Sequence, residues 1–266
     1  MSVLIVIPAR YASTRYPGKP LVELTGADGV ARTLIRRSWE AAREVAGVDR
    51  VVIATDDARI RDHAAGFGAE VVMTSDACRN GTERCAEAQA VLGWAHDIVV
   101  NLQGDAPLTP PWFVEGLIAG LKGAPEAQVA TPVLRTDGRT LSSLREDRRQ
   151  GRVGGTTAVF GQGNRALYFS KEVVPYTGAD YPPESPTPVF HHVGVYAYRP
   201  EALRDYVRWP VGPLETLEGL EQLRFLEQGR PVLCVEVEAL GRQFWELNNP
   251  SDVPKIEAMM AEMGMR

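Results

Sequence analysis

The sequence predicts an α/β fold with a mostly parallel sheet, and two observations along its 266 residues carry this prediction. Short apolar runs rich in β-branched residues alternate with longer stretches of helical periodicity, which is the pattern of βαβ units. Polar residues follow directly after several of the apolar runs. Sheets of this class bind their ligands beyond the carboxyl ends of the strands, so the same residues also predict where a site lies.

The alternation of strands and helices is clearest in the first half of the chain. Because parallel strands end at one edge of a sheet, we expect Arg10, Asp56 and Asp105, which follow three of the predicted strands, to converge on one crevice. The predicted strands cover residues 3–7, 51–54, 70–73 and 97–102, and the predicted helices cover 31–46, 58–65 and 81–92.

The second half is less regular. Residues 161–166 fit the GxGxxA dinucleotide pattern, but they lie between two strand-like runs and therefore predict a hairpin turn instead. No repeat or linker divides the sequence, so we expect one domain over residues 1–266 with an inserted lobe at about 135–200. Strands are predicted at 127–133, 156–160, 165–169, 193–198 and 232–237, a proline-rich loop at 181–188, a helix at 213–227 and a final helix starting near 249–252.

Composition excludes several classes of function. The chain has 29 basic and 34 acidic residues, a formal charge of −5, which argues against a nucleic-acid partner. Its three cysteines show no CxxC spacing, so neither a disulfide framework nor a zinc site is predicted. The apolar run at 3–7 is too short for a signal peptide, and no run approaches the ~20 residues of a membrane span. We therefore expect a cytoplasmic protein without a membrane partner.

The loop after the first predicted strand, residues 8–20 (PARYASTRYPGKP), is the strongest candidate site. It supplies the cations Arg10, Arg15 and Lys19 together with Ser13 and Thr14, and such groups can cradle a triphosphate. It is not a Walker A motif, because it lacks GxxxxGK[ST]. A solvated loop is the alternative, but a position directly after the first strand of a parallel sheet favours phosphate binding.

Two further motifs are weaker by themselves. Asp105 follows a buried strand through Gly104 and is well placed to hold Mg²⁺, although an aspartate there is also a common helix N-cap. Thr82 and Arg84 open a predicted helix and could hold a base or phosphate edge, with a routine cap as the alternative. His192 precedes a strand and says little unaided.

Residues 7–21 (IPARYASTRYPGKPL) resemble the signature of the 3-deoxy-manno-octulosonate (Kdo) cytidylyltransferases, the CMP-Kdo synthetases. Further matches follow in collinear order over almost the whole chain. They are ATD at 54–56, NGTER at 80–84, VNLQGD at 100–105, ALYFS at 166–170, HVGVYAY at 192–198, PLE at 213–215 and LEQLR at 220–224.

The resemblance implies a Rossmann-like, glycosyltransferase-A-like nucleotidyltransferase that dimerises through its inserted lobe. It implies transfer of CMP from CTP to Kdo with Mg²⁺ as cofactor and pyrophosphate as product, in lipopolysaccharide biosynthesis. It also assigns roles to residues. Arg10, Lys19 and Asp105 are catalytic; Pro8, Ala9, Arg10, Ser13, Arg15, Lys19, Thr55, Thr82 and Arg84 bind the nucleotide; Gln103, Lys171, His192, Tyr196, Glu221 and Gln222 bind the sugar; Asp105 and Asn248 bind the metal.

The sequence departs from the family pattern at four places. Ala106 stands where QGDEP has Glu, and residues 154–157 read GGTT rather than Asn-Ala-Val-Lys. Asn248 replaces an aspartate that ligates the metal, so the site carries one less negative charge. Lys171 replaces an arginine and loses the bidentate fork for a carboxylate.

These departures leave the acceptor open. The acceptor could be a modified Kdo, another sugar acid or a non-sugar compound. A separate alternative is a degenerate paralogue that binds nucleotide without turnover.

Overall fold

A computed structural model describes residues 1–13, 15–153, 155–242 and 245–266 of the chain. Contacts within it divide the chain into two compact units. The first unit comprises Met1–Glu115 together with Leu240–Arg266, and the second comprises Gly116–Ala239. The first unit is therefore discontinuous in sequence, because the whole second unit is inserted into it.

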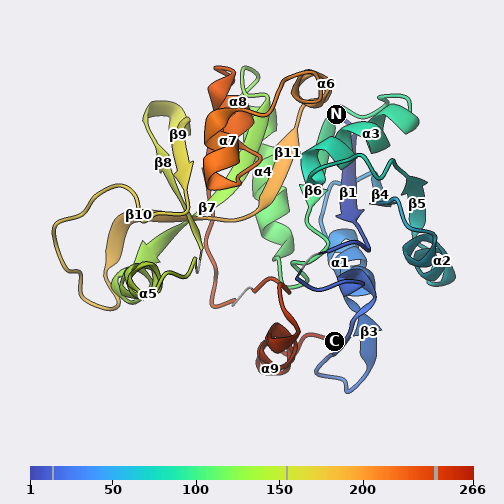
Figure 1. The fold of residues 1–266 in the computed structure, drawn as a ribbon, viewed down its shortest axis with the longest axis horizontal. Helices are drawn as coiled ribbons and strands as arrows, with labels where there is room; N and C mark the ends of the chain where they lie inside the picture. Colours follow the sequence, from blue (N-terminus) through green and yellow to red (C-terminus); the bar gives the residue numbers. More distant parts are fainter. Residues whose placement is uncertain (14, 154, 243–244) are drawn as a thin grey trace. The chain divides into compact units, whose positions relative to one another are not determined.

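The first unit contains a parallel sheet with the strand order β5-β4-β1-β6 (Figure 1). Helix α1 joins β1 to β4, α2 joins β4 to β5, and α3 joins β5 to β6, so the predicted parallel βαβ arrangement is confirmed. The strands are β1 (Val3–Ala9), β4 (Arg50–Thr55), β5 (Glu70–Met73) and β6 (Ile98–Leu102), and the helices are α1 (Leu34–Arg43), α2 (Ala58–Gly66) and α3 (Gly81–Val91).

Local sequence explains where these elements begin and end. Residues 3–7 of β1 and all five of β6 are buried, as expected of strands covered on both faces. Helix α2 begins after Asp57, whose side chain accepts from the backbone N–H of Arg59 at 2.9 Å. One boundary was predicted wrongly. The helix expected at 31–46 is shorter, because residues 31–33 form strand β3 (Ala31–Thr33), which pairs with β2 (Glu23–Thr25).

Within the first unit, the last part of the chain packs through an apolar cluster. Leu247, Ile256 and Met260 are buried together with Leu24, Leu34 and Leu108. This cluster fixes α9 (Val253–Glu262) within the unit, which also contains the short helices η1 (Lys19–Leu21) and η3 (Pro250–Asp252). Burying a side chain of this size stabilises by about 1.5–3 kcal/mol, so the segment around residue 247 is firmly anchored.

The second unit is built on a mixed sheet with the order β11-β7-β10-β8-β9, in which β12 also pairs with β7. Only the β7–β12 pairing is parallel among the described pairings of this unit. The strands are β7 (Val129–Asp137), β8 (Thr156–Phe160), β9 (Ala166–Ser170), β10 (Pro186–His192), β11 (Val195–Tyr198) and β12 (Val232–Glu236).

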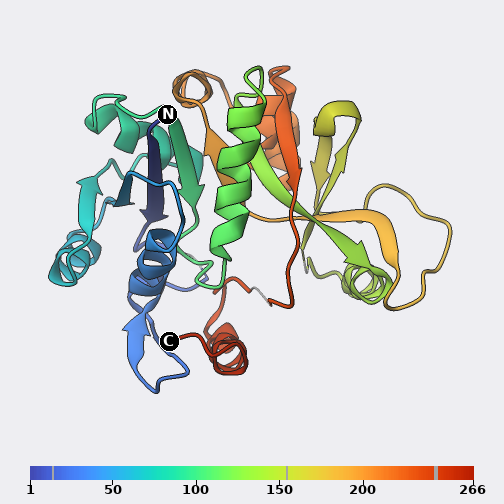
Figure 2. The same ribbon diagram turned by 180° about the vertical axis from the view of Figure 1, so that it is seen from behind.

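Helices cover this sheet. Helix α4 (Pro111–Gly123) starts in the first unit, and within the second unit it lies along β12 (Figure 2). A Cβ at Gly120 would lie 2.9 Å from a methyl carbon of Val235, so a glycine allows this close approach. The other helices are α5 (Gly138–Arg149), α6 (Pro200–Tyr206), α7 (Pro213–Glu218), α8 (Leu223–Glu227) and η2 (Gln162–Asn164).

Two predictions in the second unit were wrong and one was confirmed. The helix expected at 213–227 is two helices, because Gly219 adopts φ 62° and its N–H bonds to the carbonyl of Glu215, which ends α7. The loop expected at 181–188 ends earlier, since β10 begins at Pro186. The hairpin turn predicted at 161–166 is confirmed, because it joins the antiparallel pair β8 and β9.

Candidate active site

The cationic loop begins where β1 ends. Pro8 and Ala9 are its last strand residues, and Arg10 and Arg15 expose their side chains beyond them. The Ser13 hydroxyl accepts from the backbone N–H of Tyr16 at 3.3 Å, which curls the loop back on itself. Thr14 lies outside the described residues. The loop therefore presents two exposed guanidinium groups at the carboxyl edge of the sheet.

The fold of this loop depends on a left-handed glycine. Gly18 has φ 71°, and its N–H donates to the carbonyl of Tyr11 at 2.9 Å. A Cβ there would lie 3.1 Å from the Tyr11 ring, which in turn lies 3.3 Å below the guanidinium of Arg59. Only glycine adopts this conformation without strain while allowing the ring so close. Gly18 thereby sets the direction in which Lys19 leaves the loop.

Lys19 and Asp105 lie together. The Lys19 ammonium donates to the Asp105 carboxylate at 2.6 Å, with side-chain exposures of 15% and 27%. We predicted separate roles for these residues, Lys19 at the phosphates and Asp105 at the metal. Each neutralises the other, so a cation already lies against the carboxylate.

Asn248 reaches the same place from the end of the chain. The backbone N–H of Leu247 donates to the carbonyl of Asp105 at 2.9 Å, and the Asn248 amide donates to Glu246 at 3.4 Å. Desolvation, followed by the negative charge of Asp105, raises the pKa of the Glu246 carboxyl, although much of the residue is exposed. Because Glu246 is exposed, it is only partly desolvated, and we attribute the raised pKa mainly to the negative charge of Asp105. The segment that carries Glu246 and Asn248 is thus bound to the backbone of Asp105, and the Glu246 carboxylate senses the Asp105 charge.

Glu246 was not among the predicted site residues. The family pattern points to Asn248, which lacks the negative charge of the aspartate usual at that position, whereas a carboxylate lies two residues earlier. The sequence contained one indication of this residue: Glu246 is acidic and lies on the same short segment as Asn248. Only the fold shows that this carboxylate interacts with Asp105.

The start of α3 is buried. Thr82 is 0% exposed and Arg84 3% exposed, and the Arg84 guanidinium lies 2.5 Å from the Thr74 hydroxyl and 3.3 Å from Asp56. Thr55, at the end of β4, is also fully buried. These three predicted nucleotide residues are therefore buried beneath the surface of the first unit.

The second unit brings three of the predicted sugar residues together. The Tyr196 hydroxyl donates to the Gln222 amide oxygen at 3.1 Å, and the rings of His192 and Tyr196 lie 5.7 Å apart. All three side chains are at most 4% exposed. The His192 ring is oriented by a 2.9 Å hydrogen bond between its Nε2 and the Thr131 hydroxyl.

The other two predicted sugar residues of the second unit, Lys171 and Glu221, lie near the break between α7 and α8. A Cβ at Gly219 would lie 3.1 Å from the Lys171 ammonium, and the Lys171 backbone N–H donates to Glu218 at 2.9 Å. Glu221 lies in the same break, where its carbonyl accepts from the Tyr206 hydroxyl at 3.2 Å. Gly219 therefore brings a cation close to the segment that carries Glu221 and Gln222. Gly154, in the divergent stretch GGTT, lies outside the described residues.

Burial keeps His192 neutral. Its pKa is lowered to about 3, first by desolvation and then by the charge of His191. At neutral pH the ring offers one donor and one acceptor but no positive charge.

This shift predicts how stability depends on pH. The unfolded state binds a proton near pH 6.5 that the folded state excludes down to about pH 3, so the free energy of unfolding falls as the pH falls through this window. Between pH 7 and pH 5 the loss from His192 amounts to about 2 kcal/mol. Urea unfolding of His192→Phe at both pH values should show a smaller loss than the parent protein, by that amount. Equal losses in the variant and the parent protein would contradict the assignment.

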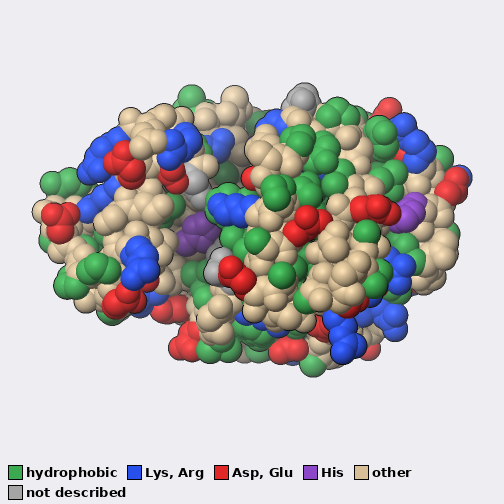
Figure 3. Space-filling view, turned by 90° about the horizontal axis from the view of Figure 1, so that it is seen from below, with side chains coloured by type: hydrophobic (Ala, Val, Ile, Leu, Met, Phe, Trp, Pro, Cys, Tyr) green, Lys and Arg blue, Asp and Glu red, His purple; other side chains and the backbone are tan. Residues whose placement is uncertain are grey.

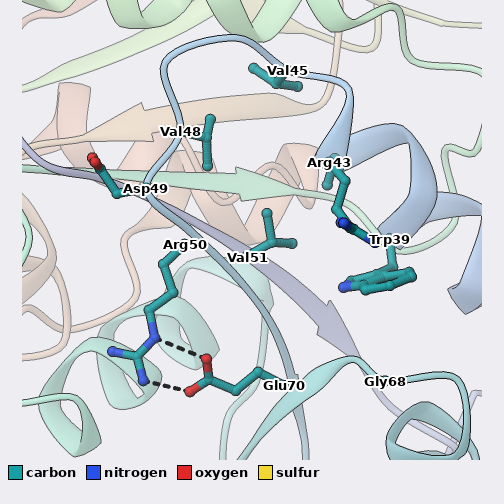
Figure 4. Close-up of a pocket in the computed structure, with 10 residues that line it drawn as sticks. Trp39, Arg43, Val45, Val48, Asp49, Arg50, Val51, Gly68 and Glu70 are labelled. Carbon is teal, nitrogen blue, oxygen red and sulfur yellow. Dashed lines mark hydrogen bonds and ion pairs between the residues drawn. The ribbon is translucent and has the colours of Figure 1, made fainter.

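A surface hollow of about 390 Å³ lies elsewhere in the first unit (Figure 4). It is lined by the end of α1 and the beginnings of β4 and β5, where Arg50 and Glu70 form a two-point ion pair. These are the amino ends of the strands, opposite the edge at which ligands bind. We therefore assign the site to the carboxyl edge and not to this hollow.

Charges of both signs are interspersed on the surface. Figure 3 shows Lys and Arg side chains lying beside Asp and Glu on the face that it presents, in keeping with the net charge of −5. Among the described residues, no three His, Cys, Asp or Glu side chains gather as a metal centre. A metal here would depend on two carboxylates and an amide.

Comparison with known proteins agrees with this arrangement. A family model described as cytidylyltransferase matches residues 4–238. The 3-deoxy-manno-octulosonate cytidylyltransferase of Maricaulis maris is 45% identical over 264 residues, covering 99% of both chains. That of Chlamydia trachomatis serovar L2 is 39% identical over 253 residues, covering 95% of this chain and 91% of its own.

Solved structures give the same result. CMP:2-keto-3-deoxy-manno-octonic acid synthetase complexed with CTP has a TM-score of 0.84 and 32% identity, and the match covers 99% of this chain and all of that one. A cytidylyltransferase from Leptospira borgpetersenii, 16% identical with a TM-score of 0.60, shares the fold and covers 97% of this chain and 86% of its own. The predicted α/β class and its parallel sheet are confirmed, and the chain belongs to the 3-deoxy-manno-octulosonate cytidylyltransferase family.

Proposed function

We propose that the protein transfers CMP from CTP to the anomeric hydroxyl of Kdo and releases pyrophosphate. One observation carries the proposal: the cationic loop and the Lys19–Asp105 pair lie at the carboxyl ends of β1 and β6, neighbouring strands of a parallel sheet. Ligands of such sheets bind at that edge. The relatives named for this reaction share up to 45% of the sequence over the whole chain, which agrees with the proposal.

The reaction needs positioning and charge compensation more than a strong base. The anomeric oxygen bonds to the α-phosphorus, the bond from that phosphorus to the bridging oxygen breaks, and the hydroxyl proton passes to solvent. Arg10, Arg15 and Lys19 offset the negative charge on the triphosphate and on the departing pyrophosphate. Pro8, Ala9 and Ser13 shape the loop, while Thr55, Thr82 and Arg84 support the nucleotide from beneath.

The donor set suits Mg²⁺. Asp105 is bonded through its backbone to the segment that carries Glu246 and Asn248, and hard divalent cations prefer the carboxylate and amide oxygens that these three side chains would supply. The ammonium of Lys19 already holds a positive charge against Asp105, which supports a cation at this place. When bound, the metal would neutralise phosphate charge.

The second unit supplies the acceptor residues. Tyr196, Gln222 and the neutral His192 offer hydroxyl, amide and imidazole groups for the hydroxyls of a sugar, and Lys171 offers a cation for its carboxylate. Gln103, which belongs to the first unit, stays a predicted acceptor residue. We further propose that the protein is a cytoplasmic homodimer whose inserted lobe, about residues 135–200, forms the dimer contact. Helices long and apolar enough to cross a membrane are absent from the described part of the chain.

Pyrophosphate release tests the proposed function directly. The purified protein with CTP and Mg²⁺ should release pyrophosphate when Kdo is added, and less with other sugar acids. Release only with a non-sugar acceptor would replace the proposed acceptor. CTP binding without release across the panel would identify a nucleotide-binding paralogue without turnover.

Two substitutions test the proposed metal site. Asn248→Asp adds a negative charge and should lower the Mg²⁺ concentration that gives half-maximal rate, by about tenfold, without changing the acceptor. Glu246→Gln removes one and should raise it by a similar factor. Direct Mg²⁺ titration by calorimetry in the presence of CTP should shift in the same two directions. Glu257→Gln, on α9, is the matched control and should leave the Mg²⁺ requirement unchanged, whereas an unchanged requirement in the Asn248 and Glu246 variants would remove both residues from the metal site.

A further inference from the structure

Asn101 is a polar residue in the middle of a fully buried strand. Every residue of β6 is buried, Asn101 is 0% exposed, and it pairs with Val6 of β1. No described residue forms a hydrogen bond with either its side-chain nitrogen or its side-chain oxygen. Leaving a buried amide unsatisfied costs about 1–3 kcal/mol, and folded proteins retain few such groups.

The Asn101 amide is directed at the first residue of α3. A Cβ on Gly81 would lie 2.9 Å from the Asn101 nitrogen and 3.4 Å from its oxygen. The same Cβ position is 3.1 Å from the amide nitrogen of Gln103, the residue that follows β6. Gln103 is two positions after Asn101, and side chains two positions apart in an extended chain point the same way. Two carboxamides thus face the start of an eleven-residue helix, where backbone N–H groups carry partial positive charge.

The start of α3 is held in place without Asn101. The Asn80 side chain accepts from the backbone N–H of Glu83 at 2.9 Å and caps the helix. Arg84 ties the first turn to Thr74 and Asp56. The free protein therefore bears the cost of the Asn101 amide without using it to fold this region.

We propose that Asn101 is a positioning residue for the nucleotide, and that its carboxamide gains hydrogen bonds only when CTP is bound. On binding, Gln103 settles against the nucleotide while the start of α3 keeps its place, and the Asn101 amide bonds to the Gln103 amide that faces the same point. If the Asn101 amide is hydrogen-bonded only in the CTP complex, these bonds lower the free energy of the complex relative to the protein without CTP. They therefore increase the affinity for CTP. This inference rests on the proposed function, since CTP is its ligand.

Asn101→Leu should move stability and binding in opposite directions. An apolar side chain of similar shape removes the unsatisfied amide, so the thermal midpoint of the free protein should equal or exceed that of the parent. The Kd for CTP, measured by calorimetry without acceptor, should rise at least about tenfold. An unchanged Kd overturns the proposal. A lower midpoint also overturns it, because the amide would then be satisfied already in the free protein, for example by buried water.

Further variants keep the test sharp. If the leucine variant does not fold, Asn101→Val provides the same two measurements with a smaller side chain. Gln128→Leu is the matched control: it removes another buried oxygen without a described hydrogen-bond partner, in the second unit, and should leave the Kd for CTP unchanged. Gly81→Ala places a methyl 2.9 Å from the Asn101 nitrogen and should weaken CTP binding. An unchanged Kd in Gly81→Ala counts against the proposal.

Failure of the inference is distinguishable from failure of the proposed function. Parent protein that binds CTP but releases no pyrophosphate with any acceptor refutes the proposed function and leaves the Asn101 test intact. Parent protein that turns Kdo over, with Asn101→Leu binding CTP equally well, refutes the inference alone.

Discussion

Lys19→Met should lower kcat/KM for CTP by about 100- to 1000-fold, the usual cost of removing one preorganised group that stabilises charge in a transition state. The methionine keeps most of the length of the side chain but loses the ammonium that lies 2.6 Å from Asp105. The triphosphate and the departing pyrophosphate would then lack a cation that the loop places at the edge of the sheet. Initial rates of pyrophosphate release over a range of CTP concentrations measure the effect.

Lys122→Met is the control for this experiment. Lys122 is exposed in the last turn of α4 and should behave as the parent protein does. Circular dichroism and thermal unfolding of Lys19→Met should stay close to the parent, because a partly exposed ion pair contributes little to stability. A kcat/KM within threefold of the parent would rule out the cationic loop as the phosphate site.

Glu215→Ala should destabilise the protein by about 3–5 kcal/mol, because it leaves a buried guanidinium without its counter-charge. Arg224 is 1% exposed and meets the Glu215 carboxylate through two bonds of 2.6 and 2.7 Å. The guanidinium also lies 4.0 Å above the Tyr206 ring. Urea unfolding measures the loss, and Glu215→Gln, which keeps an acceptor, should lose less.

An exposed ion pair provides the control. Glu184 pairs with Arg139 at the surface, and Glu184→Ala should change the free energy of unfolding very little. Replacing Glu215 and Arg224 together by leucine and methionine should recover much of the loss, because neither charge is then buried alone. A small effect of Glu215→Ala by itself would show that water reaches the Arg224 guanidinium.

The Glu215–Arg224 pair links α7 to α8 on either side of Gln222, so its loss should also raise KM for the acceptor.

The elements best predicted from sequence were those whose signals are local. β5 was predicted with its bounds, and β1 and β4 nearly so, since short apolar runs rich in β-branched residues identify strands even where, as in the edge strand β5, only part of the run is buried. The break between α7 and α8 was missed because the leucine repeat continues through it, while Gly219 alone reverses the backbone. β10 (Pro186–His192) was not predicted, because Pro186 and Pro188 are typical of a loop, although prolines also occur at the edges and first residues of strands.

The candidate site was predictable in type but not in geometry. The sequence placed cations after one strand and Asp105 after its neighbour, and the structure brings Lys19 to Asp105. Nothing local indicates that Glu246 interacts with Asp105, because their proximity depends on how the end of the chain packs. The roles of the individual residues in binding CTP and sugar stay predictions.

The discontinuity of the first unit has a consequence for synthesis. Asp105 is made early, but Leu247, whose N–H holds the carbonyl of Asp105, is made only after the whole of Gly116–Ala239. Domains generally fold as they emerge from the ribosome, yet here the apolar cluster that anchors Leu247 cannot assemble until Ile256 and Met260 exist. A growing chain therefore carries its cationic loop long before the segment around Leu247 can pack beside Asp105, and the proposed site can be complete only after α9 has been made.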